Sequence, residues 1–68
     1  MARELSDAQL RVLDCLRAWI ATHGEAPTLR EIAEQLGIGV PTVHHHLRRL
    51  TEEGLASRTG GWRGYRPR

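Results

Sequence analysis

A run of three histidines, His44–His46, is followed after one leucine by two arginines, Arg48 and Arg49. Imidazole side chains can bind a metal ion or change charge near neutral pH, and guanidinium groups can pair bidentately with phosphate or with guanine O6 and N7. The run could therefore be a metal site, a proton switch, a tag remnant, or the face of a helix that contacts an acidic partner. The backbone around it decides between these interpretations.

Of these four interpretations, metal binding is the least compatible with a helical conformation of the histidine run. Two helical ligands of one ion need i,i+4 spacing, because adjacent side chains diverge by about 100°. His44, His45 and His46 therefore cannot converge on one ion. The other candidates, His23 and Cys15, stand upstream with no matching spacing. We expect neither a metal site nor a cofactor, and the position of the run inside an amphipathic segment argues against a tag.

Helical geometry divides the run into two kinds of position. Val43, Leu47 and Leu50 would form the buried face of a helix. His46 lies beside that face, so its ring is expected to pack at the core boundary and to bond through one nitrogen. The remaining polar side chains point outward or to the flanks, where they suit phosphate or base edges. These residues are Thr42, His44, His45, Arg48 and Arg49.

Charge is distributed unevenly along the chain. Residues 1–37 carry four arginines against six acids, a balance of −2, whereas residues 38–68 carry six arginines against two acids, a balance of +4. The second half also contains three of the four histidines. This asymmetry favours a polyanionic partner. The alternatives are a solvated surface with chance clustering and, for Arg48 and Arg49, i,i+4 pairing with Glu52 and Glu53.

Three segments with helical periodicity would position these groups. The first two start with a capping box, an S/T-x-x-E/Q pattern that begins at Ser6 and at Thr28. The third starts at Pro41, whose fixed φ suits the first turn of a helix. Each segment ends at a glycine, the residue that most often follows a helix. The predicted helices span about 7–23, 29–36 and 41–53.

A small β-hairpin is predicted after the third helix, at about 55–66. Leu55–Arg58 and Trp62–Arg66 have the composition of short strands, and the residues between them are typical of a turn. The last two residues of the chain are expected to be frayed. Trp62 stands beside two glycines and is expected to fold back over the core, although an indole at a wing tip can also contact a sugar-phosphate edge.

The arginines of this hairpin have different expected roles. Arg63 and Arg66 can enter a minor groove or grip the backbone beside it. Arg58 and Arg68 are expected to be solvated. Two short helices joined by a tight turn and followed by a hairpin form a winged helix-turn-helix. We therefore predict one mainly α domain over residues 1–68, with helix 41–53 in the major groove of double-stranded DNA.

Length and composition exclude other classes of protein. A chain of 68 residues buries only about 60% of its unfolded surface. Cys15 is the only cysteine, so no disulfide can form and a reducing compartment is indicated. Neither a membrane span nor a signal peptide is present, and we expect a soluble cytoplasmic protein that begins at Met1. No arrangement of Ser/His/Asp or Cys/His suggests an enzyme or a small-molecule substrate.

Longer motifs resemble a known family. LSDAQLRVLDCLRAWIATHGEAPTLREIAEQLGI, PTVHHHLRRLTEEGLASR and RGYRP are similar to the amino-terminal winged-helix domain of the LexA family of SOS repressors. The likeness extends from Leu5 to Arg66. Its most specific parts are an L-[ST]-x-x-Q start, a G-x-x-P-[TS]-x-x-E-I link and a T-V-H-x-H-L helix. The last of these is shared by other winged-helix regulators, such as the MarR and ArsR types.

The resemblance implies roles for individual residues. Base readers would be Thr42, His44, His45 and Arg48. Residues near Thr28 and Arg30, and the wing, would hold the DNA backbone, and the amino ends of the helices at Thr28 and Pro41 suit phosphate. The turn before Val40 is one residue shorter than in that family, so its operator is not carried over. These 68 residues contain no counterpart of the self-cleaving serine-lysine protease domain of those repressors.

The features together favour a stand-alone, sequence-specific DNA-binding regulator, repressor-like, of bacterial or phage type and associated with the nucleoid. Two copies could pair on a palindromic site. The alternative is a winged-helix module that binds another regulator or a polymerase subunit. The arginines of the third helix argue against that alternative, because a protein-binding winged helix has no need of cations there.

Overall fold

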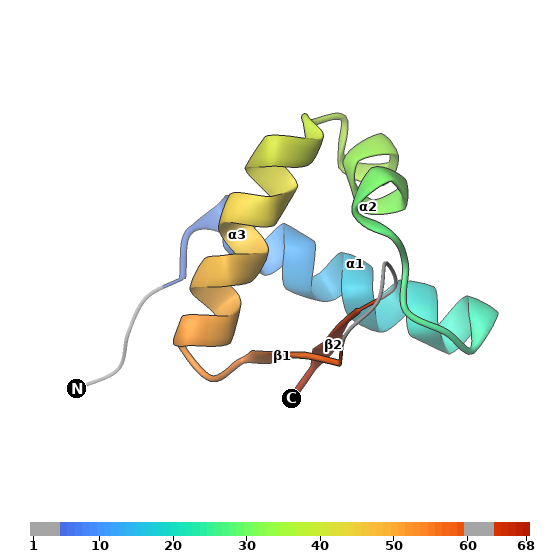
Figure 1. Cartoon of the computed structure of the whole chain (residues 1–68). Coiled ribbons are helices and arrows are strands. Elements are labelled where there is room, and N and C mark those ends of the chain that lie inside the picture. The colour runs from blue at the N-terminus through green and yellow to red at the C-terminus, as the bar shows by residue number, and fades with distance from the viewer. Residues whose placement is uncertain (1–4, 60–63) are drawn as a thin grey trace.

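The computed structural model describes residues 5–59 and 64–68 and contains three helices followed by a two-stranded hairpin (Figure 1). The elements are α1 (Asp7–His23), α2 (Leu29–Leu36), α3 (Val40–Glu52), β1 (Ala56–Arg58) and β2 (Tyr65–Pro67). Each helix contacts the other two, and the hairpin packs against α1 and α3. This arrangement is consistent with the winged helix-turn-helix that the sequence predicts.

Both predicted capping boxes are formed, and they start α1 and α2 at the expected residues. Ser6 Oγ accepts from the Gln9 amide and Gln9 Oε1 accepts from the Ser6 amide, both at 3.1 Å. Thr28 and Glu31 exchange the same pair of bonds at 3.0 and 2.8 Å. Reciprocal capping satisfies amides that have no partner within the helix. The local sequence therefore determines where both helices begin.

α3 starts and ends one residue earlier than the sequence predicts. The Gly39 carbonyl accepts the first intrahelical hydrogen bond, from the Val43 amide at 3.1 Å. The helix consequently begins at Val40, and Pro41 is its second residue, a position at which no amide hydrogen bond is required. No side chain caps this end of the helix. At the other end Glu53 forms the cap, and Gly54, with φ of 80°, redirects the chain into β1.

The hairpin is antiparallel and lies further along the chain than predicted. Ala56 pairs with Pro67, and Arg58 pairs with Tyr65. The expectation that the last two residues fray is wrong, since Pro67 belongs to β2 and the Arg68 amide donates to the Leu55 carbonyl at 2.9 Å. A two-stranded hairpin has two edges, which is where a strand tolerates proline. Trp62, expected to cover the core, lies outside the described residues.

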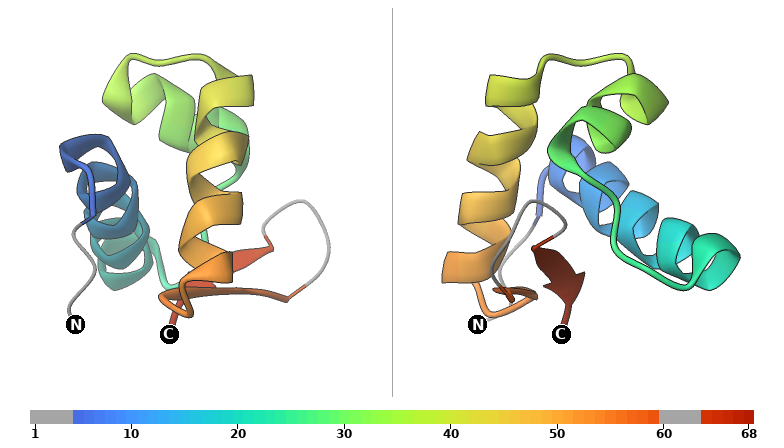
Figure 2. Two further views of the ribbon diagram at one scale, coloured as in Figure 1. Left: turned by 90° about the vertical axis from the view of Figure 1, so that its left-hand side faces the viewer. Right: turned by 45° about the vertical axis from the view of Figure 1, so that its right-hand side comes forward.

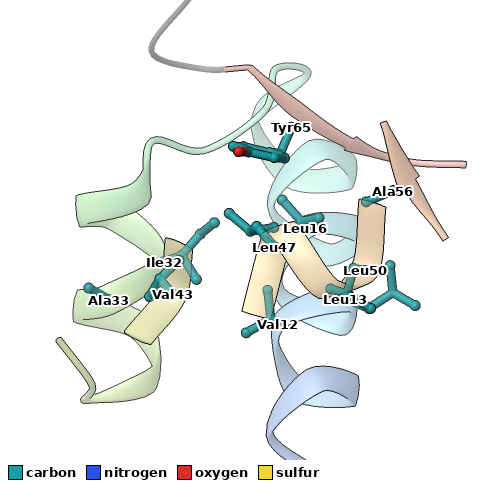
Figure 3. Close-up of a cluster of buried hydrophobic side chains, with 10 residues drawn as sticks. All are labelled: Val12, Leu13, Leu16, Ile32, Ala33, Val43, Leu47, Leu50, Ala56 and Tyr65. Atoms are coloured by element: carbon teal, nitrogen blue, oxygen red, sulfur yellow. The ribbon is translucent and has the colours of Figure 1, made fainter. Parts of the chain in front are cut away.

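A single cluster of buried apolar side chains holds the helices and the hairpin together, and Figure 3 shows these side chains pointing toward one another. Its members are Val12, Leu13, Leu16, Ile32, Ala33, Val43, Leu47, Leu50, Ala56 and Tyr65. The predicted buried face of α3 is confirmed, because Val43, Leu47 and Leu50 have no exposed surface. Burial of one such side chain contributes about 1.5–3 kcal/mol, so this face fixes the rotation of α3 about its axis.

No helix in the described residues is both long and apolar enough to cross a lipid bilayer.

Candidate nucleic-acid interface

The outward face of α3 is polar, cationic and exposed. The five side chains that helical geometry selected are all exposed: Thr42, His44, His45, Arg48 and Arg49. The same helix also exposes Val40, Pro41, Thr51 and the acidic Glu52. The predicted orientation of the five selected side chains is therefore confirmed.

His46 differs from its two neighbours in the run. Its side chain is half-buried, and its Nδ1 is buried without a hydrogen-bond partner among the described residues. Its ring meets that of His45 edge-on, with centroids 5.7 Å apart. The predicted boundary position is confirmed, while a hydrogen bond through Nδ1 is not formed. Only two of the three histidines face outward.

The two arginines of α3 have no acidic partner within the described part of the chain. Pairing of Arg48 or Arg49 with Glu52 or Glu53 is not observed. The ion pair that is observed joins Arg17 to Asp14 on α1, at 3.9 Å between exposed side chains. The guanidinium groups of α3 therefore keep their hydrogen-bond donors for an external acceptor.

The amino end of α2 is less open to an anion than the sequence suggested. The Thr28 amide already donates to Glu31 Oε1, and the Glu31 amide already donates to Thr28 Oγ1. The Thr28 hydroxyl proton and the exposed guanidinium of Arg30 remain as donors at this end. Pro41 is exposed at the start of α3, where no side chain satisfies the amides of the first turn.

The hairpin adds cations beside the carboxyl end of α3. Arg66 is exposed on β2 and pairs across the strands with Ser57. Arg58 is exposed on β1, and its Cζ lies 5.9 Å from the centroid of the Tyr65 ring. Figure 2 shows α2 joined to one end of α3 and the hairpin to the other. Arg63 lies outside the described residues.

A hollow of about 530 Å³ lies between α1 and the carboxyl end of α2. It includes Trp19, whose ring contacts that of His23 with centroids 4.3 Å apart, and Cys15. Burial raises the pKa of the Cys15 thiol. Within residues 5–59 and 64–68, no group of three or more histidine, cysteine or acidic side chains is placed to hold a metal ion.

Comparison with known proteins identifies the family to which this architecture belongs. The family described as LexA DNA binding domain matches residues 2–64. The chain belongs to the LexA DNA-binding domain family.

Curated relatives extend the same likeness. The LexA repressor of Staphylococcus epidermidis is 40% identical over 57 residues, which are 82% of this chain and 28% of that protein. The LexA repressor of Carboxydothermus hydrogenoformans is 34% identical over 55 residues, 79% of this chain and 27% of that protein. The LexA repressor of Thiobacillus denitrificans is 38% identical over 66 residues, which are 94% of this chain and 33% of that protein. The chain thus spans about a quarter to a third of the length of these relatives.

Two exposed residues near this face were not selected from the sequence. Val40 is an apolar side chain that is 39% exposed in the first turn of α3. Arg58 was expected to be solvated and is exposed, and its guanidinium also lies over the Tyr65 ring. Arg58 lies there because the strand register pairs it with Tyr65. The sequence predicted a second strand at Trp62–Arg66 but gave no residue-by-residue pairing, so this contact could not be anticipated.

Proposed function

We propose that this chain binds double-stranded DNA sequence-specifically and acts as a transcriptional repressor, with α3 in the major groove. One observation carries the proposal: α3 buries its apolar face completely and exposes His44, His45, Arg48 and Arg49 without acidic partners among the described residues. A major groove about 12 Å wide admits an α-helix. Membership of the LexA DNA-binding domain family, and the repressors among the relatives, support the same function.

The side chains of α3 divide into two chemical roles in this proposal. Thr42, His44, His45 and Arg48 contact base edges, to which hydroxyl, imidazole and guanidinium groups can donate. Arg49 lies on the flank of α3 and contacts phosphate, which positions the helix without reading sequence.

In the same proposal, residues at the helix starts and on the hairpin bind the DNA backbone. At the helix starts these are Thr28, Arg30 and the turn at Pro41. On the hairpin they are Arg63 and Arg66, which reach the backbone or the minor groove next to it.

One domain of this size covers a small half-site and neutralises a handful of phosphates, so its affinity is modest and falls steeply with salt. We propose that two copies occupy the half-sites of a palindromic operator, which raises affinity and doubles the sequence that is read. In this proposal the domain is not catalytic and acts in the bacterial cytoplasm at the nucleoid.

Fluorescence anisotropy with a labelled random duplex tests the proposal at low and at moderate salt. Wild type should bind with an affinity that falls as salt rises. Arg48→Ala and His45→Ala should weaken binding, by about fivefold or more for the arginine. Arg17→Ala removes the same charge from α1 and serves as the matched control. Absence of salt-sensitive binding by wild type would reject DNA as the partner and favour a protein partner instead.

A further inference from the structure

A hollow of about 230 Å³ lies between α3 and the hairpin, and it shares Arg48 with the outward face of α3 described above. Residues of both elements line it: Arg48, Thr51 and Glu52 from α3, Arg58 from β1, and Tyr65 from β2. Two arginines from different elements thus line one small cavity. A pair of cations in this arrangement suits a single oxyanion.

Arg58 is held at this hollow by the core. The Tyr65 ring is only 9% exposed, and Tyr65 is paired with Arg58 across the strands. The Arg58 guanidinium lies over that ring, with its Cζ 5.9 Å from the centroid. Attraction between a cation and an aromatic face reduces the freedom of the side chain, so less entropy is lost when the guanidinium binds an anion.

The other two walls of the hollow define what can enter it. The Thr51 hydroxyl donates to the Leu47 carbonyl at 2.8 Å, so its proton is not available to a ligand. Glu52 also lines the hollow and adds one negative charge there. The lining residues that can donate to an anion are therefore Arg48, Arg58 and Tyr65, while Glu52 opposes any anion bound between the arginines.

We propose that this hollow holds one backbone phosphate of the bound duplex, between Arg48 on the helix side and Arg58 on the wing side, so that Arg48 binds phosphate in place of the base edge assigned to it above. With α3 in the major groove and the hairpin beside it, the sugar-phosphate strand that separates the two grooves passes between these elements. The inference rests on the proposed function and adds Arg58 to it, in place of the solvated role that the sequence suggested. Arg58 is then a positioning residue that contributes affinity but no sequence preference.

Salt titrations by fluorescence anisotropy test the role of Arg58. Arg58→Ala should reduce the slope of log affinity against log salt by about 0.9, the value for one phosphate, and should weaken binding roughly fivefold near 0.15 M salt. The loss should be equal on duplexes of different sequence. Arg17→Ala, a loss of the same charge on α1, should change neither quantity. Glu52→Gln should tighten binding roughly twofold, because a screened like charge is removed from the hollow.

A phosphate scan identifies the contact directly. Each backbone phosphate of a short duplex is replaced in turn by a neutral methylphosphonate. One position should weaken wild type about fivefold and weaken Arg58→Ala by clearly less, because only Arg48 remains at that phosphate in the variant. Arg58→Gln, which keeps part of the side-chain stem over the ring, should behave like Arg58→Ala, and thermal melts of each variant verify that it is folded.

The outcomes separate the two proposals. Salt-sensitive binding by wild type, combined with an Arg58→Ala variant that behaves like Arg17→Ala, would overturn the phosphate site and leave the DNA-binding function intact. A phosphate scan in which no position depends on Arg58 would do the same. Absence of salt-sensitive binding by wild type would overturn both proposals.

Discussion

The histidine run shows how neighbouring residues of one type acquire different roles. His44 and His45 are exposed, whereas His46 is half-buried with an unpartnered Nδ1 among the described residues. Composition alone suggested one motif, but the rotation of α3 assigns two of its members to the surface and one to the core boundary. This division follows from the apolar residues of the same helix, which is why it could be predicted from the sequence.

The outward histidines should contribute to DNA binding. Each imidazole ring carries a nitrogen that can donate a hydrogen bond to a phosphate or a base edge. A variant carrying both His44→Gln and His45→Gln should therefore bind a duplex more weakly than wild type, as measured by anisotropy. If the variant and wild type bind equally, these histidines do not contact the DNA.

Cys15 should react slowly in the folded protein. Burial raises the pKa of its thiol, so folding favours the neutral thiol over the thiolate that attacks alkylating reagents. The stability linked to this group is present below the thiol pKa of the unfolded chain, and it is lost as pH rises through the higher folded value. Iodoacetamide labelling at pH 8, followed by mass spectrometry, should be slower in buffer than in urea. Equal rates in both solvents would contradict the effect of burial.

At the scale of elements, the start of α3 differs from the starts of the other two helices. Gly39 precedes it with φ of −77° and no capping side chain. A Cβ at Gly39 would meet only Pro41 Cδ, at 3.6 Å, which is an ordinary contact. By contrast, Gly37 closes α2 with φ of 69°, a conformation that other residues adopt at a cost. Gly39 should therefore tolerate substitution, whereas Gly37, two positions earlier, should not.

Gly39→Ser should stabilise the protein by about 0.5–1 kcal/mol. It adds a capping hydroxyl for the first turn of α3 and lowers the conformational entropy of the unfolded chain. Gly37→Ser is the matched control and should destabilise by about 1 kcal/mol, because its backbone must keep a positive φ. Urea unfolding followed by circular dichroism measures both changes. Equal effects of the two substitutions would show that backbone conformation does not govern this turn.

Elements with local signals could be predicted from the sequence, and those held by distant contacts could not. The capping boxes at Ser6 and Thr28 act within four residues, and they begin α1 and α2 where expected. The hairpin has no such signal at its end. The Arg68 amide bonds to the Leu55 carbonyl, a contact across the strands that depends on their register. The role proposed for Arg58 was missed for the same reason.

The whole molecule depends on a small core, which makes individual buried residues decisive. Leu47 has no exposed surface and lies in the cluster that joins the helices to the hairpin. A domain of this size has a stability near the lower end of about 5–15 kcal/mol. Loss of a fully buried leucine to alanine removes about 2–5 kcal/mol, a large share of that total.

Leu47→Ala should therefore leave the chain partly or fully unfolded at 37 °C, as measured by thermal melts in the far ultraviolet. Leu10→Ala provides the control, because Leu10 is 42% exposed on α1 and its loss should cost less than about 1 kcal/mol. A Leu47→Ala variant that melts close to wild type would mean that the core around α3 refills the cavity.

The separation of α3 into a buried face and an outward face also bears on how binding specificity evolves. The residues that hold the helix, Val43, Leu47 and Leu50, are not the residues that it presents to solvent. Substitutions at positions 44, 45 and 48 therefore change the exposed surface of α3 with little effect on folding. If α3 reads DNA as proposed, duplicated copies of this gene acquire new target sites one mutation at a time, through intermediates that stay folded.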